Sequence, residues 1–334
     1  MRHTFDNELA GDLPRFSSGR LLSVSFFLYC SLATFVSFAK PITPTVNTVV
    51  ASWPVEAVNA DIAATLQRVK WHVQQGQYPG NANLHYSQAQ KILSRIPTDK
   101  REPVEFHYLQ ARLLQYQHRF IEAQLHLDKL LDLDPNHING LLLKANLHLV
   151  VNDFELALNT CKDLLGVAEL MVTTTCSLEA ASYQEGKLAT SYAVLTRLIQ
   201  HSQFDKRDLV SGQASESHTW MLQIAADMAL RLGHLDQADT WLSAKTVHQQ
   251  PLSYVVQWAE VQRQLGRHEV IMEHLSAIVN RSEFKDDGLL IRLAMAEKAL
   301  LSVPSKSTWG VLAKQRIELR IARQDDFHSA DIAR

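Results

Sequence analysis

The sequence predicts an all-α protein built from stacked antiparallel helical hairpins, and three observations support this prediction. Leu, Ala, Gln, Lys and Arg recur in periodic runs of roughly 10–15 residues, a spacing typical of amphipathic helices. Only 12 Gly and 10 Pro occur in 334 residues, which leaves little room for the frequent tight turns of an all-β protein. Finally, "FIEAQLHLDKLLDLDP" at 120–135 is echoed by "FELALNTCKDLLG" from residue 154, so Phe120 and Ala123 return 34 residues later as Phe154 and Ala157.

The N-terminal region is separate from this repeating part. The segment "LLSVSFFLYCSLATFVSFA" at 21–39 has no charged residue, follows Arg15 and Arg20, and ends in a small-x-small pattern at Ala39. Two interpretations follow: a secretory signal peptide cleaved after Ala39, or an uncleaved anchor in the inner membrane, since 19 residues reach about the ~30 Å of hydrocarbon. Both place the remaining chain outside the cytoplasm, in the periplasm or anchored to its membrane, with residues 40–57 as an extended linker.

Composition and charge exclude some classes of partner. Hydrophobic residues make up 46% of the chain and charged residues 20%, enough apolar surface for an extended core. A formal net charge of −2 gives no long-range attraction to nucleic acid or to anionic lipid. We therefore expect no nucleic-acid partner, and contact with a membrane only through the N-terminal segment if it is uncleaved.

Cysteine usage agrees with export. Cys161 and Cys176 remain once Cys30 is removed with a signal peptide, and an even number in an oxidising compartment permits one disulfide. The alternative is that both are small buried residues, as free cysteines often are.

A 34-residue unit that starts at Val104 organises the middle of the chain. Small residues recur where two helices of a hairpin would cross, and Pro135 would stop a second helix because proline cannot continue the hydrogen-bond ladder. Turns are predicted at His118, Asn152, Gly186, Gly233 and Gly266. The predicted order is an irregular hairpin at 58–103, three repeats at 104–200, a polar insert at 201–217, two repeats at 218–280, and C-terminal helices of an incomplete repeat at 281–334.

This pattern resembles the tetratricopeptide repeat family. The residues that carry the resemblance are Ala111, Ala123, Pro135, Ala145, Ala157, Ala226, Gly233, Ala238, Ala259 and Gly266. His107 and Leu114 depart from the tryptophan and tyrosine usual in the family, and Glu179 stands where a small residue is expected. The chain also resembles exported bacterial tetratricopeptide proteins that have further repeats, so the last helix, about 308–324, would lack a covering partner, as in a truncated C-terminus.

The resemblance implies a right-handed superhelix whose first helices line a concave groove. The positions that usually point into it are Tyr108, Arg112, Gln115, Tyr116, Asn139, Asn146, Tyr183, Gln184, Trp220, Gln223, Asp227, Arg231, Glu260 and Arg263. Aromatic and arginine side chains are the types that dominate interface energetics. The alternative for Tyr183 and Trp220 is that they are partly buried packing residues.

Binding is therefore the predicted class of function, and two hypotheses stay open. One is a non-catalytic scaffold of the bacterial cell envelope that binds a peptide or protein partner in the groove. The other is a glycan- or peptidoglycan-binding accessory protein, in which Tyr108, Tyr116, Tyr183 and Trp220 stack on sugar rings beside Asp227 and Glu260. A purely structural role for the array also stays open.

The sequence contains no complete motif of the enzyme classes considered. The segment "HEVIMEH" at 268–274 resembles a zinc-protease helix, but Met272 occupies the place of the second histidine. No glycine-rich phosphate loop and no G-x-S-x-G motif occurs. We expect no catalytic residue, metal or cofactor. The polar insert is expected to be a surface loop, with a gate over the groove as the alternative.

Overall fold

The computed structural model describes residues 61–101, 103–201, 216–243, 247–301 and 307–322. Within these ranges every regular element is a helix. The predicted signal peptide or anchor, the linker and nearly all of the polar insert lie outside the described residues. None of the described helices combines the length and the hydropathy needed to cross a bilayer.

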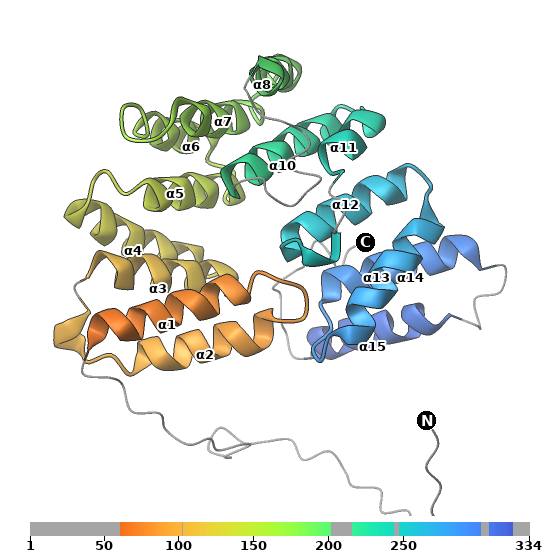
Figure 1. The fold of residues 1–334 in the computed structure, drawn as a ribbon, viewed down its shortest axis with the longest axis horizontal. Coiled ribbons are helices and arrows are strands. Elements are labelled where there is room, and N and C mark those ends of the chain that lie inside the picture. Colours follow the sequence, from red (N-terminus) through yellow and green to blue (C-terminus); the bar gives the residue numbers. More distant parts are fainter. Residues whose placement is uncertain (1–60, 102, 202–215, 244–246, 302–306, 323–334) are drawn as a thin grey trace, which may run out of the picture. The chain divides into compact units, whose positions relative to one another are not determined.

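The helices pair in sequence as antiparallel hairpins (Figure 1). The first helices of the hairpins are α1 (Ile62–Gln75), α3 (Val104–Tyr116), α5 (Ile138–Val150), α7 (Leu170–Ala181), α10 (Glu216–Arg231), α12 (Leu252–Gln264) and α14 (Asp287–Leu300). The second helices are α2 (Ala82–Ser94), α4 (Phe120–Leu133), α6 (Phe154–Lys162), α8 (Leu188–His201), α11 (Leu235–Trp241), α13 (His268–Arg281) and α15 (Thr308–Ala322). Two short 3₁₀ turns, η1 (Thr98–Lys100) and η2 (Val247–Gln249), lie in connections.

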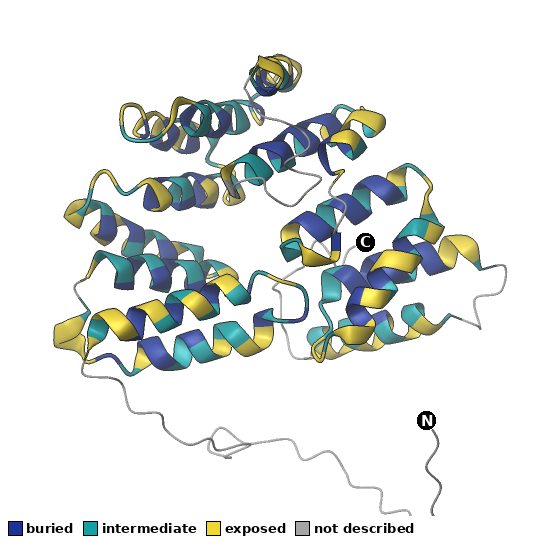
Figure 2. Cartoon of the chain, viewed as in Figure 1, coloured by how far each residue is buried: buried dark blue, intermediate teal, exposed yellow. Residues whose placement is uncertain are grey.

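Small buried residues allow the two helices of a hairpin to approach closely. Ala111 of α3 and Ala123 of α4 have no exposed surface and belong to one apolar cluster. Ala226 and Ala238 are also fully buried in a common cluster. Larger residues fill the remaining space, so the buried residues follow the faces on which helices meet (Figure 2). The all-α hairpin fold that the sequence predicts is confirmed.

The five predicted turn residues all adopt a left-handed backbone. The φ angles are 56° at His118, 62° at Asn152, 69° at Gly186, 74° at Gly233 and 73° at Gly266. At four of these turns the next amide donates back to a carbonyl five residues earlier, as Arg119 N does to Leu114 O at 2.9 Å. This closes the end of the first helix and reverses the chain.

The fourth hairpin, α7–α8, departs from the common pattern. Its first helix, α7, ends at Ala181, so Tyr183 and Gln184 lie in the turn and not on the helix as expected. Ala180 is fully buried beside Ala157, while the neighbouring Glu179 is only partly buried. Ala180 therefore supplies the small side chain that the crossing requires, and Glu179 is displaced from it.

A disulfide joins α6 to α7. The Cα atoms of Cys161 and Cys176 are 5.6 Å apart and their sulfur atoms are bonded. Both residues are almost fully buried in the apolar cluster that contains Ala145 and Ala157. The bond lies between consecutive hairpins, where it fixes the fourth hairpin (α7–α8) against the third (α5–α6).

The last described helix packs on its neighbour along one face. Ala313 of α15 is buried in the large C-terminal cluster, and Trp309 and Leu312 pack against it. Glu297 of α14 accepts hydrogen bonds from the amides of Thr308, Trp309 and Gly310, at 2.8–3.0 Å, and so caps α15. The opposite face of α15 is open: Val311 is 55% exposed and Ile321 is 60% exposed. One face of α15 is therefore covered within the described part of the chain, and Val311 and Ile321 are exposed.

Contacts far apart in sequence connect the first hairpin with the last ones. In the loop between α1 and α2, the Gly80 amide donates to Asp286 Oδ2 at 2.6 Å, and the Gln77 carbonyl accepts from the Leu252 amide at 2.7 Å. The two contacts hold this loop against the start of α12 and the connection between α13 and α14. The described repeats are thus tied end to end as well as neighbour to neighbour.

Candidate functional site

First helices of four hairpins line one polar pocket, named here the groove pocket. Its volume is about 240 Å³. Six of the predicted groove residues line it, namely Tyr108, Arg112, Gln115, Asn139, Asn146 and Trp220, together with Glu179, Leu142, Leu143, Ala145, Leu149 and Cys176. These residues come from α3, α5, α7 and α10, so successive hairpins do present their first helices to a common surface.

Side-chain amides order the floor of the groove pocket. Gln115 Nε2 donates to Asn146 Oδ1 at 2.8 Å, which connects α3 with α5. Asn139 has no such bond to a described side chain and lies on the same wall. Amide groups of this kind can both donate to and accept from a peptide backbone.

A second pocket, of about 350 Å³, adjoins the first and is named here the aromatic pocket. Arg112 and Gln115 line both pockets, and Tyr86, Tyr116 and Phe120 supply the aromatic walls. The rings of Tyr86 and Tyr116 lie 4.1 Å apart between centroids. Burial raises the pKa of both phenols, so they stay protonated at neutral pH and can donate hydrogen bonds.

Arg231 organises a cluster beside the groove pocket. Its Nε lies 2.9 Å from Asp227 Oδ2, and its two terminal nitrogens donate to the carbonyl and hydroxyl of Ser182 at 3.3 and 2.5 Å. The guanidinium carbon lies 4.1 Å from the centroid of the Tyr183 ring, and Phe154 stacks on that ring with an interplanar angle of 11°. Tyr183 therefore contacts both Arg231 and Phe154, while 38% of its surface remains exposed.

Comparisons with known proteins leave the family of this chain open. No family model matches the chain, and no curated protein matches it. Among solved structures, it is similar to a chain in a structure titled "Structure of Naa15/Naa10 bound to HypK-THB", with 16% sequence identity and a TM-score of 0.31. That match covers 80% of this chain but only 43% of the other. The hairpins themselves, with their period and small crossing residues, decide the architecture. It is a tetratricopeptide-like helical repeat.

Several predicted residues of the repeats lie outside the two pockets. Glu260 and Arg263 of α12 form an ion pair at 2.7 Å, and both are satisfied within their own helix. The Gln223 carbonyl accepts from Gln257 Nε2 at 2.8 Å. Gln184 lies in the turn after α7. The structure therefore gathers the predicted residues of α3 and α5 with Trp220 of α10, and separates those of α12 from them.

Glu179 is the site residue that the repeat-based prediction missed. The family's groove positions do not include it, because it stands at the position reserved for a small crossing residue. The signal was nevertheless visible, since a charged residue at a crossing must either be turned out or be paired. Here it is turned into the groove pocket.

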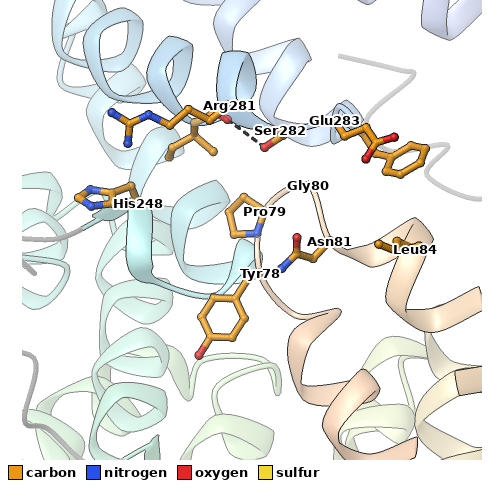
Figure 3. A pocket seen from close by; sticks show the side chains of 11 residues that line it. Tyr78, Pro79, Gly80, Asn81, Leu84, His248, Arg281, Ser282 and Glu283 are labelled. Atoms are coloured by element: carbon orange, nitrogen blue, oxygen red, sulfur yellow. Dashed lines mark hydrogen bonds between the residues drawn. The ribbon is translucent and has the colours of Figure 1, made fainter. Parts of the chain in front are cut away.

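A third pocket, of about 370 Å³, lies where the α1–α2 loop meets the α13–α14 connection (Figure 3). Tyr78, Pro79 and Gly80 form one wall, and Arg281 and Ser282 form another. A Cβ atom at Gly80 would lie 2.5 Å from the Ser282 side chain, so only glycine permits this approach. We interpret this pocket as a consequence of the contact between the α1–α2 loop and the last hairpins, here called the closure, because loop residues form part of its wall.

Histidines form two pairs, each between the two helices of one hairpin. Nδ1 of His72 lies 3.0 Å from Nδ1 of His85, and Nδ1 of His107 lies 2.9 Å from Nδ1 of His126. In the part of the chain that the structure describes, no group of three or more metal-ligating side chains comes together. In the segment that resembles a zinc protease, His274 instead packs edge-on against Trp258 at 5.3 Å between centroids.

Proposed function

We propose that this protein is a non-catalytic interaction scaffold that binds a peptide or protein partner in the groove of its repeats. The supporting observation is the convergence of Tyr108, Arg112, Asn139, Asn146 and Trp220, from three different hairpins, on one pocket. The mix of aromatic surface, amides and a guanidinium suits an extended peptide, whose backbone needs hydrogen-bond partners at regular intervals. The two adjoining pockets offer consecutive places for its side chains.

The proposal includes a location in the bacterial cell envelope, as in the exported proteins that the chain resembles. The uncharged segment at 21–39 supports export, and the Cys161–Cys176 bond suits an oxidising compartment. Labelling of free thiols after rapid denaturation of intact cells tests this point, because both cysteines are buried in the folded protein. The expected result is no labelling of Cys161 or Cys176 without prior reduction, whereas labelling without reduction would place the protein in a reducing compartment.

Glycan binding, the alternative, finds less support in the geometry. The Tyr183 ring is stacked on Phe154 and lies against the Arg231 guanidinium, so a sugar ring would compete with these contacts although 38% of the residue is exposed. Asp227 and Glu260 are both engaged in ion pairs with arginine. Three of the six residues that this hypothesis requires are therefore already occupied within the protein.

Crosslinked capture of partners from intact envelopes tests the scaffold function. The bait variant is Arg112→Ala/Tyr116→Ala/Trp220→Ala, which removes three side chains from the two pockets. If the groove is the binding surface, a partner captured by the wild type is lost with this variant. Helicity and melting temperature are measured first, to show that the variant is folded.

A matched control carries substitutions on second helices. Leu125→Ala, Lys129→Ala and Arg197→Ala remove three exposed side chains of α4 and α8 without touching the pockets. Capture is expected to be unchanged with this bait. Loss of the partner with the control, or its retention with the groove variant, would assign binding to another surface.

A further inference from the structure

Glu179 is the one carboxylate that lines the groove pocket. Its side chain makes no hydrogen bond to a described residue, whereas the neighbouring Asp227 is paired with Arg231. A carboxylate partly withdrawn from water loses hydration without compensation unless a ligand supplies a donor or a positive charge.

Arg231 is the nearest cation but is committed elsewhere. All three of its nitrogens are engaged, by Asp227 and by the carbonyl and hydroxyl of Ser182. Its planar face covers the Tyr183 ring. Of the two carboxyl groups near this guanidinium, Asp227 is paired with it, and Glu179, which lines the pocket, is not.

The walls around Glu179 suit an organic cation. Trp220 and Tyr108 line the same pocket and offer aromatic faces, and Leu142 adds an aliphatic surface. Aromatic rings attract ammonium and guanidinium groups, and aliphatic walls pack against the methylene stems of lysine and arginine. Arg112, which also lines the pocket, lies against the Tyr86 phenol and faces the aromatic pocket as well, so it can serve a partner's carbonyl or carboxylate.

From this arrangement we infer that the groove pocket takes a lysine or arginine side chain of an extended partner segment, with Glu179 as the counter-ion. The inference rests on the proposed scaffold function and names the chemistry of the partner. Asn139 and Asn146 provide hydrogen bonds to the segment's backbone on the same wall. The specificity is thus for a basic residue at one defined position of the segment, and not for a strongly cationic partner as a whole.

The test uses short peptides, capped at both ends, that differ at one position carrying Lys, Arg, Gln or Glu. The full exported chain is expected to bind the Lys and Arg peptides about tenfold more tightly than the Gln peptide, as a single charge-assisted hydrogen bond provides. Glu179→Gln, which keeps the size of the side chain, should abolish this preference. Glu185→Gln makes the same charge change at an exposed position in the turn after α7 and should leave the preference intact.

The pH dependence of binding gives a second readout of the same carboxyl group. Burial, reinforced by the charge of Asp227, raises the pKa of Glu179 to about 8, and a bound cation favours the ionised carboxylate. Affinity for the Lys peptide should therefore rise between pH 6 and pH 9 in the wild type, and stay level in Glu179→Gln.

The outcomes separate this inference from the proposed function. Peptide binding without preference for a basic residue, a preference for Glu, or a basic preference that survives in Glu179→Gln would each overturn the inference alone. If the wild type binds none of the peptides, the scaffold function in the groove falls together with it.

Discussion

Two titratable residues show how local surroundings set chemistry at the scale of single side chains. Glu179 lies where other hairpins have alanine, and burial followed by the charge of Asp227 raises its pKa to about 8. His126 pairs with His107, and burial followed by that neighbour lowers its pKa to about 4. The two pKa shifts make stability depend on pH in opposite ways. A carboxyl group is charged above its pKa and a histidine below it, so burial of the first lowers stability at high pH and burial of the second lowers it at low pH.

Glu179→Gln is expected to stabilise the protein at pH 8 and to leave stability nearly unchanged at pH 4.5. The folded state holds a proton that the unfolded state releases above about pH 4.5, so the carboxyl makes stability fall as pH rises toward 8. Water reaches part of this side chain, so we expect a gain of only about 1 kcal/mol at pH 8. Urea unfolding at both pH values measures it. Glu185→Gln is the control, and an equal effect of Glu179→Gln at both pH values would contradict the prediction.

His126 is expected to produce a loss of stability in mild acid. The unfolded state takes up a proton near pH 6.5, whereas the folded state resists protonation until about pH 4, so stability falls as pH drops through this window. His126 is partly exposed, which limits the loss to about 1–2 kcal/mol. Between pH 7 and pH 4 the melting temperature of His126→Gln should fall less than that of the wild type. His201→Gln, at an exposed position, should keep the wild-type slope.

At the scale of elements, hairpin turns and the single disulfide determine how helices pair. Turn residues at His118 and Asn152 are held at positive φ although they carry side chains, while Gly233 and Gly266 adopt it without strain. The Cys161–Cys176 bond acts between hairpins instead of within one.

Substitutions at two turn residues, Gly233→Ala and His118→Gly, should change stability in opposite directions. Gly233→Ala is expected to cost about 1 kcal/mol, and the cost is purely one of backbone conformation because no atom lies within 4 Å of the new Cβ. His118→Gly should stabilise by about 0.5 kcal/mol, the relief of strain less the added entropy of the unfolded chain. Chemical denaturation of both variants measures the effects. A stabilising Gly233→Ala would show that this turn is not constrained in solution.

Removing the disulfide should lower stability by about 3 kcal/mol, as expected for a closed loop of this length. The bonded residues are 15 apart in sequence, and both lie in the buried cluster of α5 to α7. Melting with and without a reducing agent measures the loss, and Cys161→Ala/Cys176→Ala should then show no response to reduction. An unchanged melting temperature in reductant would mean that packing alone holds α6 against α7.

At the scale of the whole described array, contacts between the first and last hairpins add a constraint that repeats do not normally need. Repeat arrays are held by neighbour contacts, and their stability is close to a sum of local terms. Here the Gly80 amide is held by Asp286, the Gln77 carbonyl by the Leu252 amide, and the charges of Asp286 and Asp287 reach Tyr116 in the aromatic pocket. Closure therefore couples the ends of the array to the groove.

Asp286→Ala should open this closure without unfolding the hairpins. The Gly80 amide would lose its acceptor, and hydrogen exchange in the α1–α2 loop should accelerate by about tenfold, as expected for loss of one hydrogen bond to a charged group. Exchange in α5 and α6 should be unaffected. Glu273→Ala, an exposed substitution on α13, is the control. Unchanged exchange at Gly80 would show that the Gln77–Leu252 contact alone maintains the closure.

The sequence by itself determined the hairpin architecture, because both its signals are local. A period of 34 residues and small residues at crossings reflect how two adjacent helices pack, so His118, Asn152, Gly186, Gly233 and Gly266 were all identified correctly as turns. It also predicted half of the residues that line the groove pocket, since equivalent positions of successive repeats face the same way. These features need only contacts between neighbours in the chain.

Tertiary structure alone decided the rest, because those features depend on which distant side chains compete for the same partner. The pairing of Arg231 with Asp227 is local, since the two residues are one turn apart on α10, but only the early end of α7 brings Ser182 and Tyr183 against the same guanidinium. Gly80 meets Asp286 across 206 residues, a distance over which no periodic pattern carries information. The local repeats therefore determined which helices form the groove, while long-range packing determined its charged contacts and the closure of the array.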